Sequence, residues 1–206
     1  MIVPMAPRAS SPSSQRARRA VAGLVLTPGA GAGSDHGALV AIDDVVAAGG
    51  TTVRRVDFPF RLAGRRAPDR PTVLVATVVE AAGALAAELG VTADRIALGG
   101  RSMGGRMCSM AVAEGLPAAA LVLVSYPLHP PGRPDRLRTE HFGRLGLPCL
   151  FVSGTRDAFG SPEELERATS LIPGPVTHVW VDGGDHGLRR RDAEVATAVG
   201  TWLGER

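Results

Sequence analysis

The sequence predicts an α/β fold: a three-layer sandwich in which a mostly parallel sheet of about six strands carries helices on both faces. The first observation is a set of short runs that are apolar throughout, as strands buried on both faces are. The second is that segments with helical periodicity separate these runs along the chain. The third is the length of 206 residues, which suits one domain with a sizeable core.

Six runs are expected to hold the strands. The first, VAGLVLTPGAGAG, enters a glycine-rich loop, and the second, TTVRRVDFPF, is expected to end at Pro59. The remaining four are RIALGG, AAALVLVSYP, PCLFVSG and VTHVWVDGG. In residue numbers, the six runs are 21–33, 51–60, 95–100, 118–127, 148–154 and 176–184.

Five segments between and after these runs are predicted as helices. The segment 71–90 begins with proline and ends in glycine, which suits a first helical turn and a helix stop. Because it is apolar almost all round, heavy burial is expected. The segment 161–172 opens with Ser-Pro-Glu-Glu, a capping-box pattern. The five segments are 34–50, 71–90, 103–115, 161–172 and 191–204.

The net charge of +3 is concentrated at the start of the chain. Residues 1–20 are rich in Ser and Pro and carry four arginines and no acid, so we interpret them as a flexible basic arm that precedes a domain at 21–206. The domain itself is close to neutral, which argues against a nucleic-acid partner. All 23 basic residues are arginine.

A cytoplasmic protein without a membrane partner is expected. No apolar run is expected to approach the roughly 18–20 residues of a membrane span. The N-terminal arginines are not followed by the apolar core of a signal peptide. Cys108 and Cys149 lie in apolar surroundings, which predicts buried free thiols rather than a disulfide.

Ser102 is the candidate nucleophile. It is the centre of Gly-Arg-Ser-Met-Gly, a G-x-S-x-G motif at 100–104 with a predicted strand before it and a predicted helix after it. The serine must lie on a tight turn, so residues two positions away cannot carry clashing side chains. The following helix directs its positive dipole end toward any anion that forms there.

His186 and Asp157 are the candidate base and its orienting acid. Each follows a predicted strand, and the carboxyl ends of parallel strands meet at one edge of a sheet, where Ser102 also lies. Asp182 and Asp185 are nearer to His186 in sequence. The acid must, however, meet the imidazole opposite the serine, which a neighbouring strand's loop achieves more readily.

The backbone N–H of Met103 and one from the loop TPGAGAGSDH, at 27–36, are expected to bind the oxyanion. Ala30 is the first choice in that loop and Gly31 the second. A dinucleotide-binding interpretation of the same glycines is disfavoured, because their spacing departs from the fingerprint and the serine, acid and histidine would remain unexplained.

Substrate contacts are expected from His36, Tyr126 and Arg101. For His36, which lies near the start of a helix, helix capping or surface exposure is favoured over a place in the pocket wall. The other three histidines are interpreted as structural: one inside the last strand, and two in loop packing or pocket walls. They are His178, His129 and His141.

These motifs together resemble an α/β-hydrolase over nearly all of 21–206. SYPLHPPGRPDRLRTEHF, LPCLFVSGTRDAFGSPEEL and GGDHGL are similar to a small group that includes the testis-expressed-thirty proteins and the hydrolase-like domain of the third NSL-complex subunit. Dienelactone-hydrolase-like proteins are more distant and carry a cysteine where this chain has Ser102. The resemblance implies the fold and a Ser–Asp–His triad.

This chain departs from the resemblance in two ways. Pro28–Gly29 replaces the His–Gly that often opens the glycine loop. The chain is also short, so that the first two strands of the full sheet and any large cap are expected to be missing. Only 126–147 is then free to overhang the site, which predicts an open, shallow pocket with YPLHPPGRP at its rim.

The sequence hypothesis is a serine hydrolase that cleaves a carboxylic ester or thioester through an acyl-enzyme. The partner is then a small acyl substrate, and neither a metal nor an organic cofactor is required. Two alternatives stay open: a non-catalytic interaction module of the same fold, and a small serine peptidase.

Overall fold

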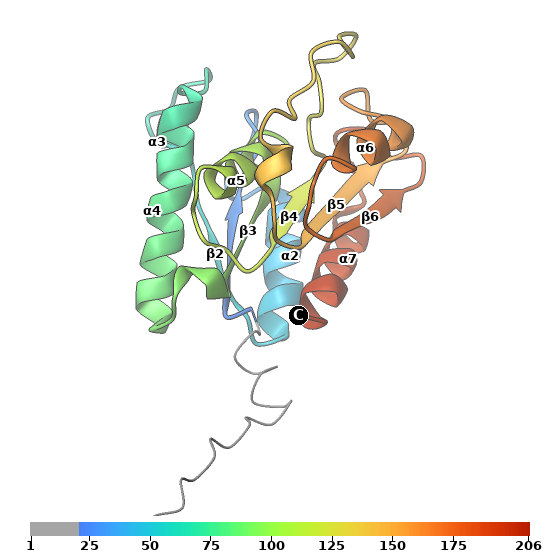
Figure 1. Cartoon of the computed structure of the whole chain (residues 1–206). Helices are drawn as coiled ribbons and strands as arrows, with labels where there is room; N and C mark the ends of the chain where they lie inside the picture. Colours follow the sequence, from blue (N-terminus) through green and yellow to red (C-terminus); the bar gives the residue numbers. More distant parts are fainter. Residues whose placement is uncertain (1–20) are drawn as a thin grey trace, which may run out of the picture.

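A computed structural model of the chain describes residues 21–206, and the arm expected at 1–20 lies outside the described residues. Six parallel strands form one sheet in the order β2-β1-β3-β4-β5-β6 (Figure 1). Five strands fall inside one of the predicted runs, and β3 extends one residue beyond its run, to Arg101. They are β1 (Gly23–Thr27), β2 (Thr52–Arg55), β3 (Ile96–Arg101), β4 (Leu121–Val124), β5 (Cys149–Gly154) and β6 (Val176–Val181).

Helices cover both faces of the sheet, which confirms the three-layer prediction. One face is packed against α2 (Gly37–Ala48) and α7 (Asp192–Gly204). The other is packed against α4 (Pro71–Leu89), α5 (Met103–Ala113) and α6 (Pro162–Thr169). The described residues also form three short helices, which are α3 (Pro59–Leu62), η1 (Ala93–Arg95) and η2 (Phe142–Arg144).

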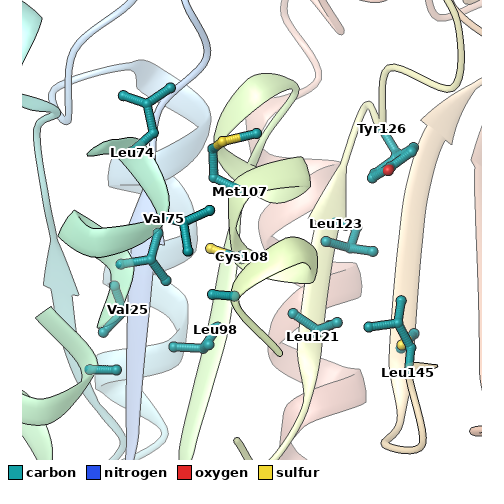
Figure 2. Packing of buried hydrophobic residues seen from close by; sticks show 14 of the residues in the cluster. Val25, Leu74, Val75, Leu98, Met107, Cys108, Leu121, Leu123, Tyr126 and Leu145 are labelled. Carbon is teal, nitrogen blue, oxygen red and sulfur yellow. The ribbon is translucent and has the colours of Figure 1, made fainter. Parts of the chain in front are cut away.

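Alternation along each central strand divides the core into two layers. In β4, Leu121 and Leu123 face α5, whereas Val122 and Val124 face the layer of α2 and α7. Figure 2 shows the first layer, where Leu98 of β3 and Leu121 and Leu123 of β4 belong to the same cluster as Met107 and Cys108 of α5. Both faces are therefore apolar, which is why the strands are apolar throughout.

The second predicted strand run extends too far. The strand ends at Arg55, and Pro59 begins the short helix α3, whose Phe60 is buried. Proline suits this place because its missing N–H is not needed at a first helical position.

The expectation that 71–90 is heavily buried is wrong. Seven residues of α4 are buried, but Val73 and Val79 on its outer face are 44% and 42% exposed. One face of α4 packs on β1, β3 and α5, while the sheet leaves the other face uncovered. Contrary to the sequence expectation, α4 is also long and apolar enough to span a membrane, the one such helix in 21–206. The buried helix of an ordinary core passes the same criterion.

Candidate active site

Ser102 lies on a strained turn between β3 and α5. Its backbone has φ 51° and ψ −117°, a region that non-glycine residues rarely adopt and that costs about 1–3 kcal/mol. The Ser102 N–H donates to the carbonyl of Val124 at 2.8 Å, which ties the turn to the end of β4. The strain is thus held in place by the neighbouring strand.

The glycines of the motif are required mainly by the end of β1. A Cβ at Gly104 would lie 2.5 Å from the Thr27 carbonyl oxygen and 2.6 Å from that of Pro28. A Cβ at Gly100 would also collide with Thr27. The predicted need for glycine is therefore met, and the closest obstacle is the adjacent strand end rather than the turn itself.

His186 lies between Ser102 and Asp157. Its Nε2 is 2.9 Å from Ser102 Oγ, and its Nδ1 is 2.8 Å and 3.0 Å from the two oxygens of Asp157. With the Nδ1 proton donated to the carboxylate, the Nε2 lone pair faces the serine hydroxyl. The three predicted side chains therefore form one continuous hydrogen-bonded chain.

The environment of Asp157 and His186 fixes both side chains. Asp157 is buried, and its Oδ1 also accepts the Phe159 N–H at 2.8 Å. The Phe159 ring stacks on the imidazole with centroids 3.9 Å apart. The sequence prediction did not include Phe159. Its position two residues after the acid was the available signal.

Backbone contacts join the loops that carry the acid and the histidine. Arg156 N–H donates to the Gly184 carbonyl at 2.8 Å, and Gly154 lies so close to Gly184 that a Cβ would not fit. Within 21–206, neither Asp182 nor Asp185 bonds to the imidazole. They accept from the Thr155 hydroxyl and the Gly187 N–H, respectively. The geometry thus favours Asp157 over the two nearer acids.

The glycine-rich loop lies opposite Ser102. Ala30 and Gly31 are the central residues of a turn closed by a bond from Ala32 N–H to the Gly29 carbonyl at 3.3 Å. Central N–H groups of such a turn are not used in closing it. Over residues 21–206, neither of these two N–H groups has a hydrogen-bond partner. Their free N–H groups meet the condition that the predicted oxyanion role requires.

Asp57, two residues beyond the end of β2, anchors this loop. Its two oxygens accept the backbone N–H and the hydroxyl of Ser34, each at 2.7 Å. In a dinucleotide fingerprint this carboxylate would bind a ribose. Here it holds the loop instead, which is a further argument against nucleotide binding.

A pocket of about 430 Å³ opens beside Ser102. Met103, Ala30 and Gly31 line it together with His186 and Phe159. The segment 126–147, yellow and projecting above the sheet in Figure 1, contributes to its wall as predicted. The remaining lining residues are Arg101, Arg106, Pro127 and Arg138.

Arg101, which is predicted to contact substrate, lines the pocket. Its Nη2 donates to the His186 carbonyl at 2.8 Å, so the guanidinium also supports the histidine loop. Burial lowers the pKa of Arg101, while Asp157 and two further carboxylates, those of Asp185 and Asp192, raise it.

The other two predicted substrate contacts are corrected. Tyr126 is 1% exposed, packs against Phe142 and Phe151, and does not line the pocket (Figure 2). The preceding Ser125 has φ 49°, which breaks the alternation of β4, so Tyr126 packs in the same layer as Leu121 and Leu123. His36 does not line the pocket either. It is the N-cap of α2, where its Nδ1 accepts the Ala38 N–H, in line with the capping interpretation.

The remaining histidines and the cysteines are structural. His178 bonds to the Thr169 hydroxyl, and His129 bonds to Glu164. His141 bonds to Ser109 at 2.8 Å, and burial followed by the charge of Arg106 lowers its pKa to about 4. Both predicted free thiols are buried, and burial raises their pKa to about 12. No group of three His, Cys, Asp or Glu in 21–206 could hold a metal ion.

Known proteins share this fold along most of the chain. An alpha-beta serine hydrolase homologue from Coxiella burnetii is 18% identical with a TM-score of 0.71, covering 88% of this chain and 84% of that one. Est1E from Butyrivibrio proteoclasticus is 16% identical with a TM-score of 0.72, covering 91% of this chain and 88% of that one. Dienelactone hydrolase from Anabaena variabilis is 18% identical with a TM-score of 0.68, covering 90% of this chain and 85% of that one.

A sequence-family model described as an alpha/beta hydrolase domain matches residues 20–202, nearly the whole domain seen in the structure. The structural neighbours share the fold at identities below 25%, and the family model shows kinship directly. The chain therefore belongs to the alpha/beta hydrolase family.

Proposed function

We propose that the protein is a serine hydrolase that cleaves a carboxylic ester or thioester of a small acyl substrate. The observation that carries this proposal is the hydrogen-bonded chain from Ser102 Oγ through His186 to Asp157, open to a pocket. A serine hydroxyl becomes nucleophilic when a positioned base takes its proton, and the arrangement meets that condition.

The reaction would run in two stages. The Ser102 oxygen attacks the acyl carbon while His186 Nε2 takes the hydroxyl proton, and Asp157 stabilises the imidazolium that forms. His186 then gives that proton to the leaving oxygen or sulfur, and an acyl-serine remains. Water, deprotonated by the same imidazole, attacks the acyl-serine and releases the acid and the free serine.

The oxyanion formed at each attack would be held by backbone N–H groups. Met103, first in α5, has no intrahelical acceptor for its N–H, and the helix dipole adds positive potential there. Ala30 or Gly31 supplies the second donor from the opposite loop. Such a donor is worth about 10²–10³ in kcat in related chemistry.

Two of the structural neighbours support this reaction class. Est1E has been solved with ferulic acid bound, and another neighbour, from Paleococcus ferrophilus, is a monoacylglycerol lipase. We also infer that the chain belongs to the small hydrolase-like group with the testis-expressed-thirty proteins, on the motifs quoted above.

Fluorophosphonate labelling tests the nucleophile. We expect one labelled serine in the wild type and none in Ser102→Ala. Ser109→Ala is the matched control, because Ser109 also bonds to a histidine, His141. That pair is buried, and no carboxylate within 21–206 bonds to His141. Labelling that survives Ser102→Ala would refute the proposal. Absence of both labelling and ester hydrolysis would favour the non-catalytic interaction module.

A further inference from the structure

Three arginines line the pocket without a carboxylate partner. Arg101, Arg106 and Arg138 come from the end of β3, from α5 and from the 126–147 segment. Across 21–206 none of them forms an ion pair, and no acid lines the pocket. Five other arginines are paired with carboxylates: Arg54, Arg55, Arg65, Arg133 and Arg191.

The three guanidinium groups keep most of their donors free. Each has five N–H donors. Arg101 uses one on the His186 carbonyl, and Arg138 uses one on the Pro127 carbonyl at 3.3 Å. In the described chain, the Arg106 side chain has no hydrogen-bond partner, and its Nε is buried, as is the unpaired Nε of Arg101. A buried charged donor that lacks a hydrogen-bond partner destabilises the protein, and a ligand with acceptor atoms would offset that cost.

Arg106 and Arg138 are close enough to repel one another. Burial lowers the pKa of Arg138, and the charge of Arg106 lowers it further. Glu140 acts in the opposite direction, but its side chain is exposed and does not pair with either arginine. Arg101 differs, because three carboxylates lie near it. The unbalanced positive charge of the pocket is therefore concentrated at Arg106 and Arg138.

The position of this arginine pair relative to Ser102 sets where a ligand would lie. Arg106 N–H donates to the Ser102 carbonyl at 3.1 Å, so Arg106 is one helical turn beyond the nucleophile. Arg138 approaches the same pocket from the overhanging segment. A planar guanidinium fits the two oxygens of a carboxylate or phosphate.

We propose, on the basis of the serine hydrolase function above, that the substrate is an anionic ester or thioester whose carboxylate or phosphate binds Arg106 and Arg138 while its scissile carbonyl lies at Ser102. The anion belongs either to the acyl half or to the leaving group. Both sources share the same recognition chemistry, and matched pairs of substrates separate them.

Two substrate pairs test the proposal. Mono-4-nitrophenyl adipate and 4-nitrophenyl hexanoate share the acyl length and differ by a terminal carboxylate. Hexanoyl coenzyme A and hexanoyl N-acetylcysteamine share the thioester and differ by phosphates on the leaving group. We expect the anionic member of one pair to be preferred at least about tenfold in kcat/KM, the magnitude of one charge-assisted hydrogen bond.

Arginine variants tie that preference to the pocket. Arg138→Gln and Arg106→Gln are expected to lower the anionic-to-neutral ratio of kcat/KM about tenfold or more, and Arg138→Lys to restore part of it. Arg136→Gln is the matched control, since Arg136 is exposed on the same segment and lies outside the pocket. Thermal unfolding of each variant verifies that it is folded. Equal ratios in wild type and both Gln variants would overturn the proposal.

A binding measurement separates this proposal from the catalytic one. Adipate and coenzyme A, the released anions, are titrated calorimetrically into Ser102→Ala with and without Arg138→Gln. We expect one of them to bind and its affinity to fall about tenfold with Arg138→Gln. Failure of catalysis with this binding intact would refute the hydrolase alone, whereas binding of neither anion, or binding indifferent to Arg138, would refute the anion site.

Discussion

Replacing Asp157 with Asn should remove most of the activity while leaving the size of the side chain unchanged. Asp157 Oδ1 accepts the Phe159 N–H, and Oδ2 faces His186 Nδ1 at 2.8 Å. An Asn that keeps its oxygen on Phe159 must turn its NH₂ group toward Nδ1. The imidazole would then accept at Nδ1 and carry its proton on Nε2, facing Ser102. In that tautomer it cannot take the serine proton.

The expected loss follows from this inversion of the histidine tautomer. An enzyme with the base in the wrong tautomer loses about 10⁴ in kcat. At 1.36 kcal/mol for each factor of ten, this corresponds to about 5.4 kcal/mol of lost transition-state stabilisation. Turning the amide over instead would set an NH₂ group against the Phe159 N–H, a buried donor facing a donor, which costs about 1–3 kcal/mol.

The assay is steady-state hydrolysis of a 4-nitrophenyl ester together with the rate of fluorophosphonate labelling. Asp182→Asn and Asp185→Asn are the matched controls, because both acids lie near His186 in sequence without bonding to it. We expect less than a threefold change in either control. A loss below tenfold in Asp157→Asn, or a loss in one control equal to it, would refute the assignment of the acid.

Three further predictions concern the turn, an exposed position on α4 and the histidine. Gly104→Ala should lower the free energy of unfolding by about 1–3 kcal/mol, because its Cβ would meet the carbonyl oxygens of Thr27 and Pro28. Gly83→Ala, in open space on α4, should raise it by about 0.5–1 kcal/mol; equal urea midpoints would contradict both. Phe159→Leu should lower kcat/KM about two- to tenfold by removing the ring stacked on the imidazole, and an unchanged rate would show that the stack does not position the base.

The sheet could be predicted because its signal is local. Strands buried on both faces carry apolar side chains on both, so the six strand runs can be recognised as continuous apolar stretches. Parallel strands also place their carboxyl ends at one edge of the sheet. Ser102, Asp157 and His186 each follow such an end within a few residues, and the structure brings them into contact. The exposure of α4 was not visible, since its outer valines and alanines match those that pack on the sheet.

The pocket wall was less predictable because it depends on an irregular segment. Arg138 lies 36 residues from Ser102 in sequence and far from any strand end, and its approach to the site depends on the path of 126–147. No periodic pattern encodes such a path. Arg106 was easier to suspect, because it lies one helical turn after the nucleophile.

Tyr126, whose predicted substrate contact was wrong, connects the core to the pocket wall. Tyr126 was expected to touch substrate, yet its ring packs between Phe142 and Phe151 in the core. Its hydroxyl donates to the Arg138 carbonyl at 2.8 Å, and the Arg138 N–H donates to the Leu128 carbonyl at 2.8 Å. The backbone of Arg138 is thus held from both sides, at one side by a buried aromatic residue. A segment without helix or strand at that point therefore presents its guanidinium to the pocket from a fixed position.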